Sequence, residues 1–297
     1  MSESLKEPLH VTPEPVGHGP SRPGGLVGAP VVGAPVAGPL AGTQAVGRRG
    51  SDFLYYGLRN KKLVFGLGLE LLLVLFAIIG PHIANHTTSE FLVQHQPPSG
   101  QYWLGTDSFG HDVFAQLATG LGVSYLVGAL GALSAAVIGM ALGFTAGWRG
   151  GILDEVLQML TNIIVMIPSL VLLVVIGSYL STRGVMFEGV FIGLTTWPWV
   201  ARAVRAQTFS LRSREFVELA RLSGKRAWSI VIRDIAPNMA SYLFLVIILL
   251  FGSSMLLAAS YDFLGLGPTN VTSIGSMMNQ SQLWSALALG YWWWFIP

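Results

Sequence analysis

The strongest constraint on this chain is a series of apolar runs, each long enough to cross a membrane. A membrane-spanning helix needs about 20 mostly apolar residues, and the runs 63–84, 123–148, 156–180 and 239–261 meet that length. Of all residues, 52% are hydrophobic and 11% are charged, whereas a soluble domain carries about 25% charged residues. The chain is therefore predicted to be an all-α membrane protein.

Two further runs extend the prediction to a polytopic helical bundle of about six spans. Residues 188–200 form a short aromatic run, and residues 283–297 begin a sixth span that the chain does not complete. Pro168 interrupts the third run and predicts a kink there. Glu70 lies within the first run and is expected to be protonated, to face a partner helix, or to lie near enough to an interface to reach water. A proton relay is not favoured, because no second membrane acid or histidine is expected near it.

The first 50 residues differ from the rest of the chain in composition. They are rich in Gly and Pro and have no continuous apolar core before Arg48 and Arg49. Such a stretch cannot bury enough apolar surface to offset the entropy of ordering, and it does not fit a signal peptide. We therefore expect a disordered tail at 1–50 and a transmembrane domain at 51–297. The chain contains no cysteine, which excludes disulfides.

The distribution of Lys and Arg predicts the orientation in the membrane. Basic residues are concentrated before the first run and in the segment 202–238, whereas the loops that alternate with these hold only Arg183. Because basic residues are enriched on the cytoplasmic side, we expect the N-terminus and the segment 202–238 to be cytoplasmic. The protein is then a multi-pass protein of the cell membrane, with an extracytoplasmic loop at 85–121.

The segment 202–238 is too long and too patterned for a simple connection. Residues 214–223 are predicted to form a short helix with one apolar face, Gly224 ends it in a left-handed conformation, and 227–235 forms a second helix before Pro237. An exposed helix with an apolar face needs a partner to cover that face. One alternative is anionic lipid, held by the basic residues. Nucleic acid is disfavoured, because aromatic residues for base stacking are nearly absent.

A second motif lies before the second run, at 103–113. Asp107 suits a turn or a helix N-cap, Gly110 permits a tight backbone, and Asp112 suits the start of a helix. The set Asp107, His111 and Asp112 also offers oxygen and nitrogen ligands for a metal ion. A turn and a cap explain all three residues without an ion, and we prefer that interpretation.

These patterns resemble known sequences of membrane transporters. The spacing Glu218-Leu219-Ala220-x3-Gly224-x12-Pro237 resembles the EAA loop of ATP-binding-cassette (ABC) importer permeases, where Leu219 replaces an Ala and Ala236 a Leu. The stretch Gly105-Thr106-Asp107-x2-Gly110-His111-Asp112 resembles the LGTDxxGRDV segment of the oligopeptide/dipeptide type, with His111 in place of Arg. Residues 143–159, 263–268 and 291–297 are similar to further segments of that family, although family arginines are lost at 122 and 160.

The resemblance implies a type I ABC importer transmembrane domain that takes up peptides, with oligosaccharides and nickel or another small solute as alternatives. It implies that Glu218, Leu219, Ala220, Gly224 and Pro237 couple the chain to an ATPase. It further implies a second permease subunit, two ATPase subunits that bind ATP and Mg, and an extracytoplasmic substrate-binding protein. The chain itself is expected to be non-catalytic and without a cofactor or metal, because it has no phosphate-binding loop and no clustered ligands or catalytic triad. A secondary transporter and a membrane-anchored regulator are the rival classes.

Overall fold

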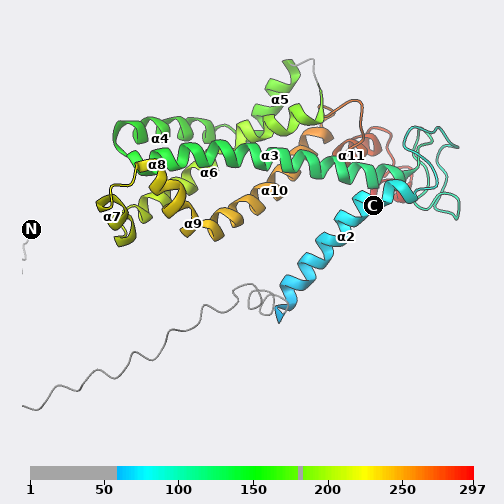
Figure 1. Ribbon diagram of the computed structural model, residues 1–297. Helices are drawn as coiled ribbons and strands as arrows, with labels where there is room; N and C mark the ends of the chain where they lie inside the picture. Colours follow the sequence, from blue (N-terminus) through cyan, green and yellow to red (C-terminus); the bar gives the residue numbers. More distant parts are fainter. Residues whose placement is uncertain (1–58, 180–182) are drawn as a thin grey trace, which may run out of the picture. The chain divides into compact units, whose positions relative to one another are not determined.

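The structure is a computed structural model that describes residues 59–179 and 183–297. The predicted tail at 1–50 lies outside these residues. Within them the protein is built from helices and loops (Figure 1). In chain order the helices are α2 (Lys61–Ile83), α3 (Val113–Arg149), α4 (Gly151–Met166), α5 (Ser169–Tyr179), α6 (Val185–Leu211), α7 (Glu215–Leu222), α8 (Ala227–Ile230), the π-helical turn η1 (Val231–Ile235), α9 (Ala236–Asn238), α10 (Ala240–Phe263), α11 (Ile274–Leu283) and α12 (Trp292–Phe295).

Three of the described helices, α2, α3 and α10, are long and apolar enough to cross a membrane. The pair α4 and α5 is a fourth candidate span, bent by 81°. The bend confirms the kink predicted at Pro168. Ile167, the residue before this proline, is extended, with φ −89° and ψ 123°, because the proline ring disfavours a helical conformation there.

Two helices are longer than the apolar runs that predicted them. Helix α3 begins at Val113, ahead of the run that starts at 123, and α6 continues to Leu211, beyond the run that ends at 200. Helix α6 therefore occupies about the first three turns of the segment 202–238 that was predicted to be a loop. Side-chain pairing explains the extension of α6: Arg205 forms a salt bridge with Asp154 of α4, and Arg202 donates to the side-chain oxygen of Asn162 at 2.8 Å.

The expected start of a sixth span at Leu283 is wrong. Helix α11 ends at this residue, and the chain then turns through Ser285 and Gly290, which have φ values of 54° and 78°. The segment packs against the loop that precedes α3 instead of continuing as a helix. Tyr291 stacks on His95 with a centroid distance of 4.5 Å, and Trp294 is buried in a cluster with Val113.

Helices α3 and α6 form the central contact of the fold. Gly139, Gly143 and Gly147 recur at intervals of four residues on α3 and face α6. A Cβ atom on Gly143 would lie 2.7 Å from the carbonyl oxygen of Ala201, and one on Gly147 would lie 2.7 Å from the Cβ of Thr208. Small residues at such intervals allow helices to approach closely in lipid. The contact leaves no room for a side chain at these positions.

The two ends of the bundle differ in character (Figure 1). Helices α7, α8 and α9 lie at one end, which we call the basic end. The loop 84–112, α11 and α12 lie at the other end, which we call the loop end. Helix α3 joins the two, because it starts directly after the loop 84–112 and finishes beside the segment 212–238.

Candidate functional site

Helix α7 carries the residues that the sequence singles out at the basic end. Its first turn holds the acids Glu215 and Glu218. Gly224 follows the helix with φ 73°, and its amide donates to the carbonyl oxygen of Arg221 at 2.9 Å. The helix and its glycine termination are therefore confirmed. Pro237 lies beyond them in the short helix α9, immediately before α10.

The apolar residues of α7 point in two directions, so the expectation of one apolar face is wrong. Val217 and Ala220 are buried at 0% and 6% exposure in the core cluster that includes Ile235. Leu219 and Leu222 are 64% and 85% exposed. The buried pair attaches α7 to the protein itself, and the exposed pair remains available for another surface.

The exposed residues of α7 form a continuous stripe. Glu215, Glu218, Leu219 and Leu222 are spaced i, i+3, i+4 and i+7, which places them on one side of a helix, and all four are exposed. We call these four residues the α7 stripe. Trp228 is also exposed at 48%. The stripe combines two acids with two large apolar side chains.

Several basic residues of this segment bind the protein's own groups. The guanidinium of Arg221 lies 4.7 Å from the ring centroid of Trp148, and Arg212 donates to the carbonyl oxygen of Gly147 at 3.2 Å. Lys225 forms a salt bridge with Asp234 at 2.9 Å. Cation–π contacts and carbonyl hydrogen bonds of this kind fix the segment against the end of α3.

At the loop end, Asp107 is the centre of a hydrogen-bond network. Its side chain is fully buried, and it accepts from the amides of Phe109 and His111 at 2.8 Å each. It also accepts from Nε2 of Gln116 at 2.7 Å, and Nδ1 of His111 lies 3.2 Å from its second oxygen. The turn predicted at Asp107 is therefore present. Gln116, which sequence reasoning missed, ties this turn to α3.

The other residues of the motif hold the same loop in place. Gly105 and Gly110 have φ values of 75° and 80°, and a Cβ atom on Gly110 would lie 2.2 Å from the carbonyl oxygen of Leu92. Thr106 donates its hydroxyl to the carbonyl oxygen of Val93 at 2.6 Å. These residues give a compact loop in which only glycine fits at the tightest approach.

Asp112 is the N-cap of α3, as the sequence predicts. Its carboxylate accepts from the amides of Phe114 and Ala115 at 2.8 and 3.4 Å. Its side chain therefore points to α3, whereas Asp107 and His111 contact one another. Burial raises the pKa of Asp112 above its ordinary value of 3.8, because a low-dielectric site disfavours the charged form.

Replacing Asp112 with Ala is expected to lower the free energy of unfolding by about 1 kcal/mol, since the helix loses its N-cap. Replacing it with Asn keeps the acceptor and is expected to have almost no effect at neutral pH. Because the pKa is raised in the folded state, the stabilisation from Asp112 is greatest in acid and declines as the pH rises through that pKa. Thermal unfolding of the three proteins across pH 3–7 measures both effects. An Asn variant as unstable as the Ala variant contradicts the cap.

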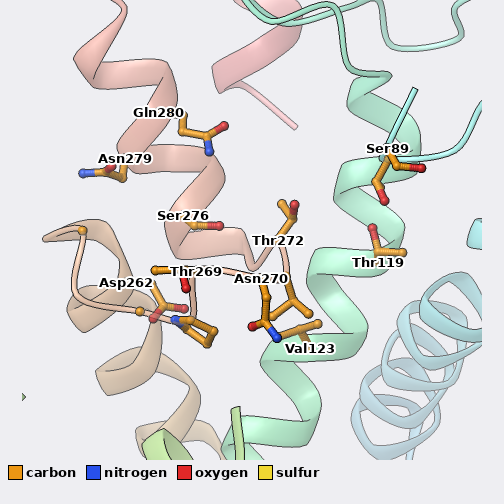
Figure 2. A pocket seen from close by; sticks show the side chains of 15 residues that line it. Ser89, Thr119, Val123, Asp262, Thr269, Asn270, Thr272, Ser276, Asn279 and Gln280 are labelled. Atoms are coloured by element: carbon orange, nitrogen blue, oxygen red, sulfur yellow. The ribbon is translucent and has the colours of Figure 1, made fainter. Parts of the chain in front are cut away.

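A pocket of about 600 Å³ opens at the loop end, between α3, α11 and the connection from α10 to α11. Figure 2 shows Ser276 and Gln280 of α11 on one side, with Ser89 and Thr119 opposite them. The lining residues are Thr88, Ser89, Thr119, Val123, Asp262, Gly265, Gly267, Pro268, Thr269, Asn270, Val271, Thr272, Ser276, Asn279 and Gln280.

The chemistry of this pocket is that of uncharged hydrogen-bonding groups. Hydroxyls and carboxamides make up most of its lining, and Asp262 is the one charged residue among the lining residues that the structure describes. Such a surface donates to and accepts from amide or hydroxyl groups without selecting a strong charge. Sequence reasoning missed the pocket, because its walls come from three segments that are distant in the chain.

Comparisons with known proteins agree on one group of transport proteins. The family described as "binding-protein-dependent transport system inner membrane component" matches residues 139–296. The family described as "N-terminal TM domain of oligopeptide transport permease C" matches residues 50–98. The first match includes all of the segment that carries the α7 stripe, and the second includes α2.

Three curated relatives illustrate the similarity. A putative peptide transport system permease protein of Brucella abortus is 32% identical over 241 residues, covering 80% of this chain and 79% of the relative. The oligopeptide transport system permease protein OppC of Mycobacterium bovis is 30% identical over 226 residues, covering 74% and 77%. The dipeptide transport system permease protein DppC of Bacillus subtilis is 29% identical over 238 residues, covering 79% and 73%.

Proposed function

Because the chain belongs to the family of binding-protein-dependent transport system inner membrane components, we propose that it is a membrane-spanning subunit of an ATP-driven peptide importer. The names of the relatives, which specify dipeptide and oligopeptide transport, support peptides as the substrate. The chain supplies helices for the pathway, whereas ATP and Mg are bound by partner ATPase subunits. A second permease subunit completes the pathway.

The observation that carries this proposal is the α7 stripe. Leu219 and Leu222 are 64% and 85% exposed at the basic end. Large exposed apolar side chains of this kind indicate a partner protein that buries them. In this proposal the partner is the ATPase, and the contact includes Glu218. Gly224 and Pro237 set the ends of the element, while Ala220 attaches it to the bundle.

The structure disfavours the lipid alternative for this segment. Binding to anionic lipid requires free basic side chains facing the membrane. Arg214, Arg226 and Arg233 are exposed, but the apolar residues of the α7 stripe stand beside Glu215 and Glu218. Two acids beside the apolar residues would be repelled by an anionic surface.

The orientation follows from the same assignment. If the ATPase docks at the basic end, this end and the N-terminus are cytoplasmic, and the loop end faces the extracytoplasmic side. A substrate-binding protein then delivers its ligand at the loop end. The pocket of 600 Å³ with hydroxyl and carboxamide groups lies at that end, and these groups match the hydrogen-bonding capacity of peptide amides.

Oligosaccharides are a weaker fit than peptides. Exposed aromatic faces are the usual surfaces for sugar rings, and the segment Trp292-Trp293-Trp294 is the obvious candidate. However, Trp294 is 3% exposed, and Trp293 donates its ring N–H to the carbonyl oxygen of Thr106 at 3.3 Å. Two of the three rings are therefore occupied by packing within the protein.

The double substitution Leu219→Asp/Leu222→Asp is expected to remove the stimulation of ATP hydrolysis by substrate and binding protein. Each buried leucine in an interface contributes about 1.5–3 kcal/mol, so loss of both weakens docking by about a hundredfold or more. The assay uses the reconstituted complex with a panel of peptides, oligosaccharides and nickel. The Ser213→Asp variant adds a charge at an exposed residue outside the α7 stripe and is expected to behave as wild type.

Each result of this assay decides a separate point. Stimulation by peptides alone supports the substrate class, and stimulation by oligosaccharides or nickel would replace it. Stimulation that survives in the double Asp variant would show that α7 is not the docking element. Transport by the chain without an ATPase would favour a secondary transporter and would reject the importer.

A further inference from the structure

Two buried carboxyl groups meet at the loop end of the bundle, and neither of them was given a role from the sequence. Glu188 lies in the first turn of α6, and Asp262 lies in the last turn of α10. Their exposures are 5% and 2%, and the two side chains are neighbours. The pair links two helices that are far apart in the sequence.

Most of the oxygen atoms of this pair have no hydrogen-bond partner among the described residues. Both carboxyl oxygens of Glu188 and Oδ1 of Asp262 are buried without a partner. Oδ2 of Asp262 accepts from the hydroxyl of Ser273 at 2.5 Å. A buried polar oxygen without a donor is costly, so the arrangement requires a positive group or a proton that the protein's own side chains do not provide.

The surrounding described residues form no ion pair with either acid. None of the salt bridges among residues 59–179 and 183–297 includes either acid. Arg183, which precedes α6, donates to the carbonyl oxygen of Gly265 at 3.1 Å. The remaining neighbours are uncharged in their ordinary state: Tyr261 of α10, Gly177 of α5, and Ser273 and Gly275 at the start of α11.

The space beside Glu188 is too small for an organic cation or a hydrated metal ion. Asp262 borders the pocket of 600 Å³, but its unpartnered Oδ1 is buried. The cavity that Glu188 lines with Arg183 and Tyr261 has a volume of about 10 Å³, whereas even one water molecule needs about 10–15 Å³. Two carboxylates in contact in a low-dielectric site cannot both remain ionised. A single proton satisfies both conditions, because it removes one charge and turns one carboxyl into a donor for the other.

We propose that Glu188 and Asp262 form a proton-binding site in which the two carboxyl groups share one proton and tie α6 to α10. Asp262 also lines the 600 Å³ pocket, where it lies below the start of α11 (Figure 2). Removal of the proton places two negative charges in contact and separates the two helices beside the pocket. The site goes beyond the proposed importer function and does not depend on the identity of the transported solute.

Infrared difference spectroscopy of the full chain in lipid nanodiscs, titrated with acid and base, tests the proton directly. A protonated carboxyl has a carbonyl-stretch band that a carboxylate lacks. We expect such a band in the wild type, its loss as the pH rises, and its absence in Glu188→Gln. The Glu155→Gln variant alters an exposed acid of α4 and is expected to keep the band. A band unchanged in Glu188→Gln overturns the proposal.

Thermal unfolding in the same nanodiscs gives a second readout. We expect the midpoint temperature of the wild type to fall as the pH rises, since deprotonation adds a buried charge. The Glu188→Gln/Asp262→Asn double variant carries no charge at the site and is expected to show no such fall. Parallel behaviour of the two proteins overturns the proposal, as does a stabilisation that follows sodium concentration instead of pH. If the double variant does not fold, Glu188→Gln alone is compared in the same way.

Discussion

Replacing Gly224 with Pro is expected to abolish substrate-stimulated ATP hydrolysis while the subunits remain assembled. Gly224 has φ 73°, and a proline ring holds φ near −65°. The substitution also removes the amide that donates to Arg221. A proline in an incompatible conformation costs about 3 kcal/mol or more, and a tenfold change corresponds to about 1.4 kcal/mol. We therefore expect stimulated hydrolysis to fall by about a hundredfold or more.

A matched control separates backbone geometry from steric bulk. A Cβ atom at position 224 would meet no other atom of the described residues within 4 Å, so a side chain itself fits. Asn tolerates the left-handed conformation, and Gly224→Asn is expected to retain most of the stimulation. Adding Glu218→Arg to the proline variant reverses a charge of the α7 stripe. We expect this second change to remove the remaining stimulation of ATP hydrolysis. Full stimulation in Gly224→Pro would rule out α7 as the coupling element.

Replacing Gly143 with Leu is expected to prevent stable folding of the bundle. A Cβ atom there would lie 2.7 Å from the carbonyl oxygen of Ala201 and 2.8 Å from the Cβ of Val204. The obstacle includes backbone, so α3 and α6 must separate. Overpacking of a core costs about 1–3 kcal/mol where side chains can adjust, and we expect a larger loss here. The yield of monodisperse protein and its thermal midpoint measure the effect.

Gly252 of α10 provides the control for this substitution. A Cβ atom there would meet no described atom within 4 Å, so Gly252→Leu adds the same side chain without forcing helices apart. We expect its yield and midpoint to match the wild type. Equal losses in both variants would mean that insertion of a bulky residue, rather than separation of α3 from α6, causes the defect.

Much of the helical framework could be predicted from the sequence, because apolar length alone identifies a membrane helix. Helix ends and kinks could also be predicted where a single residue determines the backbone conformation. Gly224 ends α7, Asp112 caps the start of α3, and Pro168 bends the third run. Each of these effects acts over a few neighbouring residues. A single sequence contains enough information for them.

Features that depend on distant residues could not be predicted in this way. Hydropathy ended the run 188–200 before Arg202 and Arg205, because it counts both as charges. It cannot show that Asn162 and Asp154 of α4 pair with them. The same limit hid the contact between Glu188 and Asp262 and the walls of the pocket at the loop end. It also hid the split of α7 into a buried and an exposed side, since both sides are rich in apolar residues.

The length of α3 has a mechanical consequence. Its 37 residues span about 55 Å at 1.5 Å per residue, well beyond a hydrocarbon core of about 30 Å. Arg212 and Arg221 attach the segment around α7 to the end of this helix. If α3 pivots about that end by about 5°, its other end moves by about 5 Å, given the same rise per residue. A small rotation imposed on one aqueous side thus becomes a displacement the width of an amino-acid side chain on the other.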